Sequence, residues 1–149
     1  MMKSKGFTLI ELVVCIGILL ILLSIANINL NVRDKIEAKE QIKTLALDIK
    51  QLKNYSQVNN CRTSIKINDN GYTVNYGKKS KSVKFNKLVK LESTNVRIIN
   101  FTSEGKPSYI AKKYSACTIN YTINDKKTVK ITIQPVTGKV SYYESENQK

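Results

Sequence analysis

An uncharged, apolar run near the N-terminus constrains this chain more than any other feature. Residues 12–32 contain no charged side chain, and 16 of these 21 positions are Leu, Ile, Val, Ala or Cys. As a helix the run would be about 32 Å long, which is enough for one crossing of a lipid bilayer. We therefore expect a single membrane-spanning helix in a chain whose 149 residues suggest one folded domain.

A carboxylate stands at the edge of this run. Glu11 lies five positions after Gly6 and directly before the first residue of the run. A charged side chain inside a membrane helix costs about 2.5–3.5 kcal/mol on insertion scales, so it needs a partner of opposite charge. Cleavage after Gly6 would create that partner, because the new α-amino group of Phe7 is mostly protonated near neutral pH. In a stack of helices, Glu11 of one subunit would then meet the N-terminus of a neighbour.

The residues around this glutamate carry a family resemblance. The sequence Gly6-Phe7-Thr8-Leu9-Ile10-Glu11-Leu12 resembles the cleavage and methylation motif of type IV pilins and type II secretion pseudopilins, and the basic residues 1–6 resemble its leader peptide. The resemblance implies that a prepilin peptidase cuts between Gly6 and Phe7 and then N-methylates Phe7. It also implies that residues 7–32 are the transmembrane and assembly helix, with Glu11 as its assembly glutamate.

Residues 33–58 are expected to form an amphipathic helical arm that continues this helix. They contain no Pro or Gly, and apolar residues recur at spacings of four and three, as on one face of a helix. The stripe consists of Ala38, Ile42, Leu45, Ile49 and Leu52, and we expect Leu47 and Tyr55 to widen it. The stripe is predicted to pack on a sheet.

The remaining residues, 59–149, are predicted to form a β-rich globular head. Alternating segments bounded by turn residues indicate strands, and Asn70-Gly71 is a strong hairpin signal. The predicted strands cover 63–68, 72–76, 82–89, 96–101, 117–123, 128–134 and 140–143. The expected fold class is α+β, with a long N-terminal helix packed on a mostly antiparallel head, as the pilin resemblance also implies.

The end of the chain carries a second resemblance. A turn from Phe101 to Gly105, followed by a hairpin and a final Gly-Lys-Val strand, is similar to minor pseudopilins of the GspH and FimT type. That resemblance implies a minor subunit, at the start or tip of a filament. The interrupting pair Lys112-Lys113 departs from the pattern.

The head is strongly basic. Residues 59–149 contain 17 Lys and Arg against 6 Asp and Glu. Six lysines fall in a stretch without an acidic residue, which favours polyanions such as DNA through counterion release. The alternative is a solvated surface that protects sheet edges. The six residues are Lys78, Lys79, Lys81, Lys84, Lys87 and Lys90.

Two cysteines of the head leave two interpretations open. Cys61 and Cys117 would form a disulfide if the head lay in an oxidising compartment, whereas Cys15 lies in the apolar run. A loop of this length contributes about 4 kcal/mol on the chain-entropy model. The alternative is a pair of free thiols, and sequence spacing does not distinguish them.

The sequence disfavours an enzyme. The chain has no His, which excludes nucleophilic triads and metal sites built on His, and three scattered cysteines are too few for an all-cysteine zinc site. It also lacks a glycine-rich phosphate loop. We expect no catalytic residue, no metal and no cofactor.

The expected function is that of a minor pilin or pseudopilin in a type IV pilus, a competence pilus for DNA uptake or a type II secretion system. The resemblance implies as partners a prepilin peptidase, other pilins, a membrane platform protein and an assembly ATPase. It implies a single-pass protein of the cytoplasmic membrane with an extracytoplasmic head, and later a surface or periplasmic filament. The alternatives are a membrane-anchored binding domain that does not polymerise and a secretory signal peptide cut near Ala26.

Overall fold

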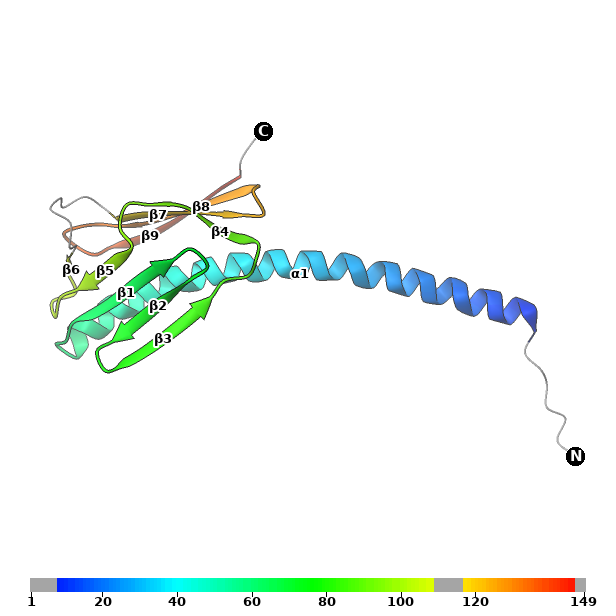
Figure 1. The fold of residues 1–149 in the computed structure, drawn as a ribbon, viewed down its shortest axis with the longest axis horizontal. Helices are drawn as coiled ribbons and strands as arrows, with labels where there is room; N and C mark the ends of the chain where they lie inside the picture. The colour runs from blue at the N-terminus through cyan, green and yellow to red at the C-terminus, as the bar shows by residue number, and fades with distance from the viewer. Residues whose placement is uncertain (1–7, 109–116, 147–149) are drawn as a thin grey trace, which may run out of the picture. The chain divides into compact units, whose positions relative to one another are not determined.

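The computed structural model describes residues 8–108 and 117–146, without the side chains of 25–31 and 146. Within them, the helix α1 (Leu9–Val58) precedes nine strands (Figure 1). The chain divides into two compact units, residues 1–34 and 35–149. The strands are β1 (Thr63–Asn68), β2 (Gly71–Tyr76), β3 (Lys79–Lys84), β4 (Val89–Thr94), β5 (Ile98–Phe101), β6 (Pro107–Ser108), β7 (Cys117–Ile123), β8 (Lys127–Ile133) and β9 (Val140–Glu146).

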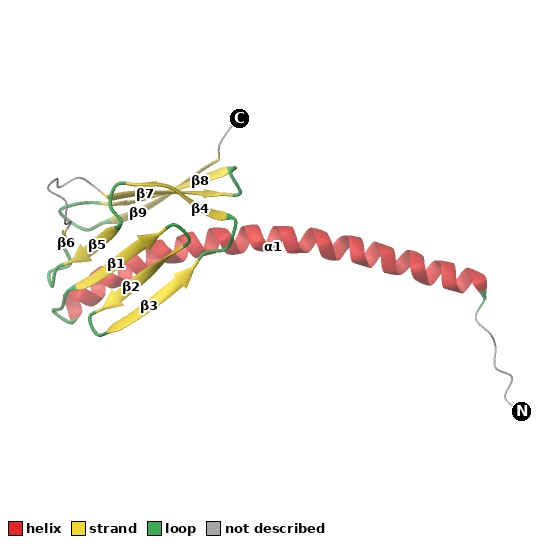
Figure 2. Ribbon diagram, in the orientation of Figure 1, coloured by secondary structure: helices red, strands yellow, loops and turns green. Residues whose placement is uncertain are grey.

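The second unit contains two antiparallel sheets. The first has the strand order β3-β2-β1-β5-β6, and the second has the order β4-β7-β8-β9 (Figure 2). Every strand pair in both sheets is antiparallel. The helix comes first in the chain and the antiparallel sheets follow it, which confirms the predicted α+β class with a pilin-like head.

The arm of α1 buries the stripe that its periodicity predicted. All five predicted residues, from Ala38 to Leu52, have no exposed surface, and Ala46 joins them in the core. Fully burying an aliphatic side chain of this size stabilises a fold by about 1.5–3 kcal/mol, so the stripe is a major part of the stability of the unit. The predicted widening by Leu47 is wrong, because Leu47 lies outside this face and is 53% exposed. Tyr55 stays partly exposed against the ring of Tyr76.

A buried carboxylate joins the arm to the first sheet. Asp48 of α1 is 6% exposed and accepts a hydrogen bond of 2.7 Å from the hydroxyl of Tyr72 on β2. The ammonium of Lys81 on β3 lies 3.3 Å from the same carboxylate oxygen. The hydrogen bond and the ion pair satisfy a charge that would be costly to bury alone. Asp48 therefore fixes which part of the sheet faces the arm.

Two predicted strands match in both bounds, and one is wrong. Thr63–Asn68 and Cys117–Ile123 form β1 and β7 as predicted. The predicted strand over 82–89 instead covers the end of β3, a connection and the start of β4. Sequence alternation failed there because β3 is an edge strand with an exposed surface, so its lysines and serines give no apolar pattern.

The hairpin between β1 and β2 forms as predicted, but for another reason. Its turn residues Asp69 and Asn70 do not adopt positive φ angles. Gly71 is required because a Cβ at this position would collide with the backbone carbonyl of Val83 on β3. The close approach of two strands, and not the conformation of the turn, explains the glycine.

Candidate functional site

The first candidate site is the N-terminal end of α1, where Thr8 and Glu11 bind each other. The backbone N–H and the hydroxyl of Thr8 both donate to Oε2 of Glu11, at 3.0 and 2.8 Å. In return, the Thr8 hydroxyl accepts a longer bond of 3.4 Å from the backbone N–H of Glu11. This is a capping box, in which a Thr before the helix and a Glu three residues later satisfy backbone donors at the helix start.

The capping box gives Thr8 and Glu11 a role that the sequence analysis missed. The Thr-x-x-Glu signature before an apolar run would have identified it. An ionised carboxylate accepts about four hydrogen bonds, so Glu11 keeps acceptor capacity for a donor from another molecule. Its surroundings are apolar, because Leu9, Ile10 and Leu12 are more than half exposed. The capping box thus holds the Glu11 carboxylate in position on a helix surface that is otherwise uncharged.

The other two residues of the predicted processing site, Gly6 and Phe7, lie outside the described residues. Cleavage after Gly6 and methylation of Phe7 therefore stay predictions. Among the residues that are described, no helix meets the length and apolarity needed to cross a membrane. The membrane-spanning role of residues 12–32 likewise stays a prediction.

The second candidate site is the basic stretch from 78 to 90, which the structure divides into separate groups. Lys78 lies in the turn between β2 and β3, Lys79 begins β3, and Lys81 pairs with Asp48. The other three lysines, Lys84, Lys87 and Lys90, line one groove of about 510 Å³ between the β1–β2 turn and the β3–β4 connection. Six lysines that are close in sequence thus form no single cluster.

The wall of this groove is held by hydrogen bonds. Oε1 of Gln41 on α1 accepts a bond of 2.7 Å from the backbone N–H of Asn86, and Asn70 O accepts one of 2.9 Å from the N–H of Phe85. Phe85 is buried against the rings of Tyr72 and Tyr121. These contacts fix the backbone that carries Lys84 and Lys87, so the groove is preformed.

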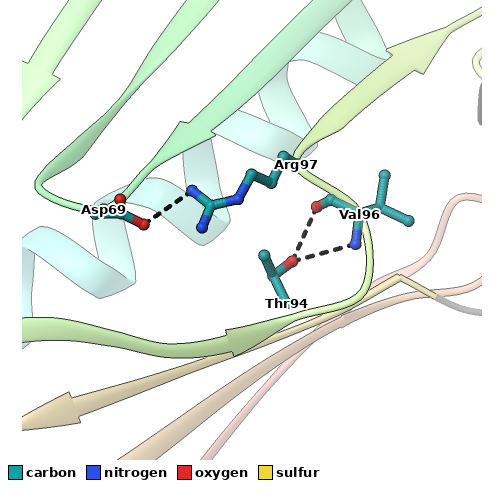
Figure 3. Close-up of polar contacts among 4 residues, drawn as sticks. All are labelled: Asp69, Thr94, Val96 and Arg97. Atoms are coloured by element: carbon teal, nitrogen blue, oxygen red, sulfur yellow. Dashed lines mark hydrogen bonds and ion pairs between the residues drawn. The ribbon is translucent and has the colours of Figure 1, made fainter.

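Two acidic residues near the groove are occupied by the chain's own cations. Asp69 accepts a bond of 2.8 Å from Arg97, which reaches across from the segment before β5 to the β1–β2 turn (Figure 3). In the same segment, Thr94 bonds the backbone of Val96 and shapes the bend that presents Arg97. Asp125 accepts bonds from Lys90 at 2.8 and 3.1 Å. Because Asp69 and Asp125 are paired in this way, the groove is cationic through Lys84 and Lys87, which are both exposed.

Of the two interpretations of the head cysteines, the structure has the one with free thiols. Cys61 is a partly buried free thiol between α1 and β1, and Cys117 is a buried free thiol at the start of β7. Cys61 precedes a strand of the first sheet, and Cys117 begins a strand of the second sheet. Sequence spacing does not show this placement in different sheets. Burial raises the pKa of the Cys117 thiol to about 12. A thiol of this kind is a poor nucleophile at neutral pH.

The buried Cys117 thiol predicts a loss of stability in alkali. Because its pKa is raised in the folded state, its contribution is fully present below the pKa of the unfolded chain, near 9, and is lost as the pH rises toward 12. The free energy of unfolding should fall by about 4 kcal/mol from this group over that range. Burial also raises the pKa of Tyr121, which adds to the loss at higher pH.

Urea unfolding of the full chain in neutral detergent from pH 7 to 11 would measure this loss. Cys117→Ala should make the dependence between pH 9 and 11 shallower by up to about 1.4 kcal/mol per pH unit. Equal slopes for the two proteins would contradict the assignment.

Metal and catalytic sites were not expected from the sequence. Within residues 8–108 and 117–146, no three His, Cys, Asp or Glu side chains come close enough to hold a metal ion. The described carboxylates with partners serve in the capping box, in ion pairs, in the link from the arm to the sheet or, for Glu37, in a hydrogen bond from Gln41.

Comparison with known proteins bears on the first candidate site. Residues 1–27 match the family model described as the prokaryotic N-terminal methylation motif. No curated protein and no solved structure matches the chain. The match covers Gly6, Phe7, Thr8 and Glu11 and the first part of the apolar run. It indicates a type IV pilin-like protein whose precursor is processed by prepilin peptidase.

Proposed function

We propose that this protein is a minor subunit of a type IV filament system. The observation that carries the proposal is the match of residues 1–27 to the methylation motif, together with a helix that begins at Leu9 and is capped by Thr8 and Glu11. In this proposal prepilin peptidase cuts between Gly6 and Phe7, and the new amino group of Phe7 is N-methylated. Residues 12–32 hold the precursor in the cytoplasmic membrane with the head outside. The chain has no catalytic role of its own.

Assembly is proposed to use the carboxylate of Glu11. The charged N-terminus of Phe7 in one subunit pairs with Glu11 of a neighbour, because both charges lie among apolar helix surfaces where an unpaired charge is costly. Thr8 holds the carboxylate in place through the capping box. The other partners in this proposal are further pilins, a membrane platform protein and an assembly ATPase. The proposal is tested by the N-terminal residue of the mature protein, which should be N-methylated Phe7.

The choice among filament systems rests on the head. The proposal of a minor subunit is based on the turn between Phe101 and Gly105, which is similar to a turn in minor pseudopilins of the GspH and FimT type. In this turn Gly105 has a positive φ of 73°, and its N–H donates to Thr102 O at 2.8 Å. The system is a type II secretion pseudopilus, a type IV pilus or a competence pilus. The basic groove favours the competence pilus, in which the head would contact DNA.

The groove gives this DNA contact a testable form. Replacing Lys84 and Lys87 by Gln in the full chain in neutral detergent should weaken binding to duplex DNA and lower the slope of log K against log salt by about 2, because each lost phosphate contact contributes about 0.9. The matched control is the Lys78→Gln/Lys79→Gln protein, which loses the same charge at the β2–β3 turn. Equal losses in both variants would show only a general effect of net charge.

A further inference from the structure

A second groove, distinct from the one that Lys84 and Lys87 line, opens between the arm of α1 and the β7–β8 turn. It has a volume of about 260 Å³ and lies within the second unit of the chain. Its apolar lining includes Ile36, which is 54% exposed, and Ile123, which is 4% exposed. Four lysines also line the groove: Lys35, Lys39, Lys126 and Lys127. An exposed isoleucine beside lysines is complementary to an amphiphile with a negative head.

The acidic residues near this groove face cations of the chain. Glu144 on β9 binds the ammonium of Lys39 at 2.8 Å, and Asp125 in the turn binds Lys90 at 2.8 Å. The turn is held rigidly, because Asn124 and Asp125 both adopt positive φ angles of 52° and Lys126 N–H donates to Ile123 O at 3.1 Å. Lys39 is therefore paired with Glu144, and the cationic character of the groove is assigned to Lys35 and Lys126.

The position of the groove along the chain indicates its occupant. Only two residues, Arg33 and Asp34, separate Val32, the last residue of the apolar run, from Lys35. Even a fully extended chain spans about 11 Å over that distance. The headgroup layer on each side of a bilayer is about 5–8 Å thick. If residues 12–32 cross the membrane, as the proposed function requires, the backbone of Lys35 lies within about 11 Å of the end of the apolar run, and its long side chain extends toward the headgroups.

We propose that this groove binds the headgroup and upper acyl chain of an anionic phospholipid in the membrane that holds residues 12–32. Lys35 and Lys126 contact the phosphate, and Ile36 contacts the first methylene groups below it. A polybasic surface next to a membrane segment gains about 1 kcal/mol for each lysine near the headgroups, or about fivefold in the docking equilibrium. The inference rests on the membrane anchor of the proposed function and adds a lipid contact of the head.

The test uses the absence of tryptophan from the chain. Ile36→Trp places a single indole in the groove, and Val136→Trp places one in the β8–β9 connection, where Val136 is 75% exposed. Each full-length variant is reconstituted in phosphatidylcholine vesicles with and without phosphatidylglycerol. Quenching by lipids brominated near the headgroup then reports contact with the bilayer.

The expected result is strong quenching of the Ile36→Trp indole in anionic vesicles, weaker quenching in neutral vesicles and little quenching of the Val136→Trp indole. Adding Lys35→Gln and Lys126→Gln to Ile36→Trp should lower the docking equilibrium by about fivefold per lysine. Adding Lys78→Gln and Lys79→Gln instead removes the same charge from the β2–β3 turn and should leave quenching unchanged.

Alkaline extraction of the same vesicles separates the two levels of the proposal. If the protein stays in the bilayer but the Ile36→Trp indole is quenched equally in neutral and anionic vesicles, or not at all, the lipid site is wrong and the anchor stands. If alkali extracts the protein, the anchor is wrong and the lipid site falls with it. Equal losses for the two pairs of lysine substitutions would also overturn the site, because they would show attraction by net charge alone.

Discussion

Glu11→Gln should abolish incorporation into filaments while leaving the start of α1 intact. Glutamine at this position still completes the capping box with Thr8, since the box accepts either Glu or Gln. It carries no charge, however, and cannot pair with the protonated N-terminus of a neighbour. Loss of a desolvated charge pair costs about 2–5 kcal/mol, so the fraction of protein in filaments should fall at least about tenfold.

Three further variants separate the charge from the cap. Glu11→Ala removes both, and Thr8→Ala removes the cap at a cost of about 1 kcal/mol but keeps the charge. Glu40→Gln is the matched control, because it neutralises an exposed carboxylate elsewhere on α1. The measurement is the ratio of filament to membrane protein in cells that produce the complete assembly system. Normal assembly of Glu11→Gln would mean that Glu11 serves only as a cap.

Asp48→Ala should cause the largest loss of stability among single substitutions of the polar groups in the second unit. It leaves the hydroxyl of Tyr72, which is 1% exposed, without its acceptor and removes the partner of Lys81. An unsatisfied buried donor costs about 1–3 kcal/mol, and the lost link between the arm and the sheet adds to it, so we expect a loss of about 3 kcal/mol. Urea unfolding in neutral detergent, followed by circular dichroism, measures this loss.

The chain provides matched tyrosines for this experiment. Tyr72→Phe removes a hydroxyl that donates to Asp48, and it should destabilise the fold by about 1–2 kcal/mol. Tyr121→Phe removes a hydroxyl that is buried without a hydrogen-bond partner in the described structure, and it should be neutral or slightly stabilising. A double-mutant cycle of Asp48→Ala with Tyr72→Phe should show a coupling of about 1 kcal/mol or more. Equal effects of the two tyrosine substitutions would contradict the role of Asp48.

The parts of the fold that the sequence predicted share one property, which is a buried face with a regular period. The arm shows its stripe at helical spacing, and β1 and β7 alternate strictly because one face of each lies in the core. The strands that the sequence did not predict correctly, β3 and β4, lack such a regular buried face. β3 is an exposed edge strand, and the alternation of β4 is broken by a bulge between Leu91 and Ser93.

The site was harder to predict because proximity in sequence does not set proximity in space. Lys78 and Lys87 belong to one basic stretch, yet they lie at a turn and in a connection on either side of β3. The ion pair of Lys81 with Asp48 crosses from sheet to helix, over a separation of 33 residues. The Thr8 cap was local and could have been predicted, since its signature spans only four residues.

The central claim is that this chain is a processed filament subunit, and its N-terminal residue tests that claim most directly. Intact mass and N-terminal sequencing of the protein from its native membrane should show a chain that begins at N-methylated Phe7, without residues 1–6. A start at Met1 or Met2 would contradict the claim and leave a simple membrane anchor. A start near Asn27 would contradict it as well, because the apolar run would then be a signal peptide.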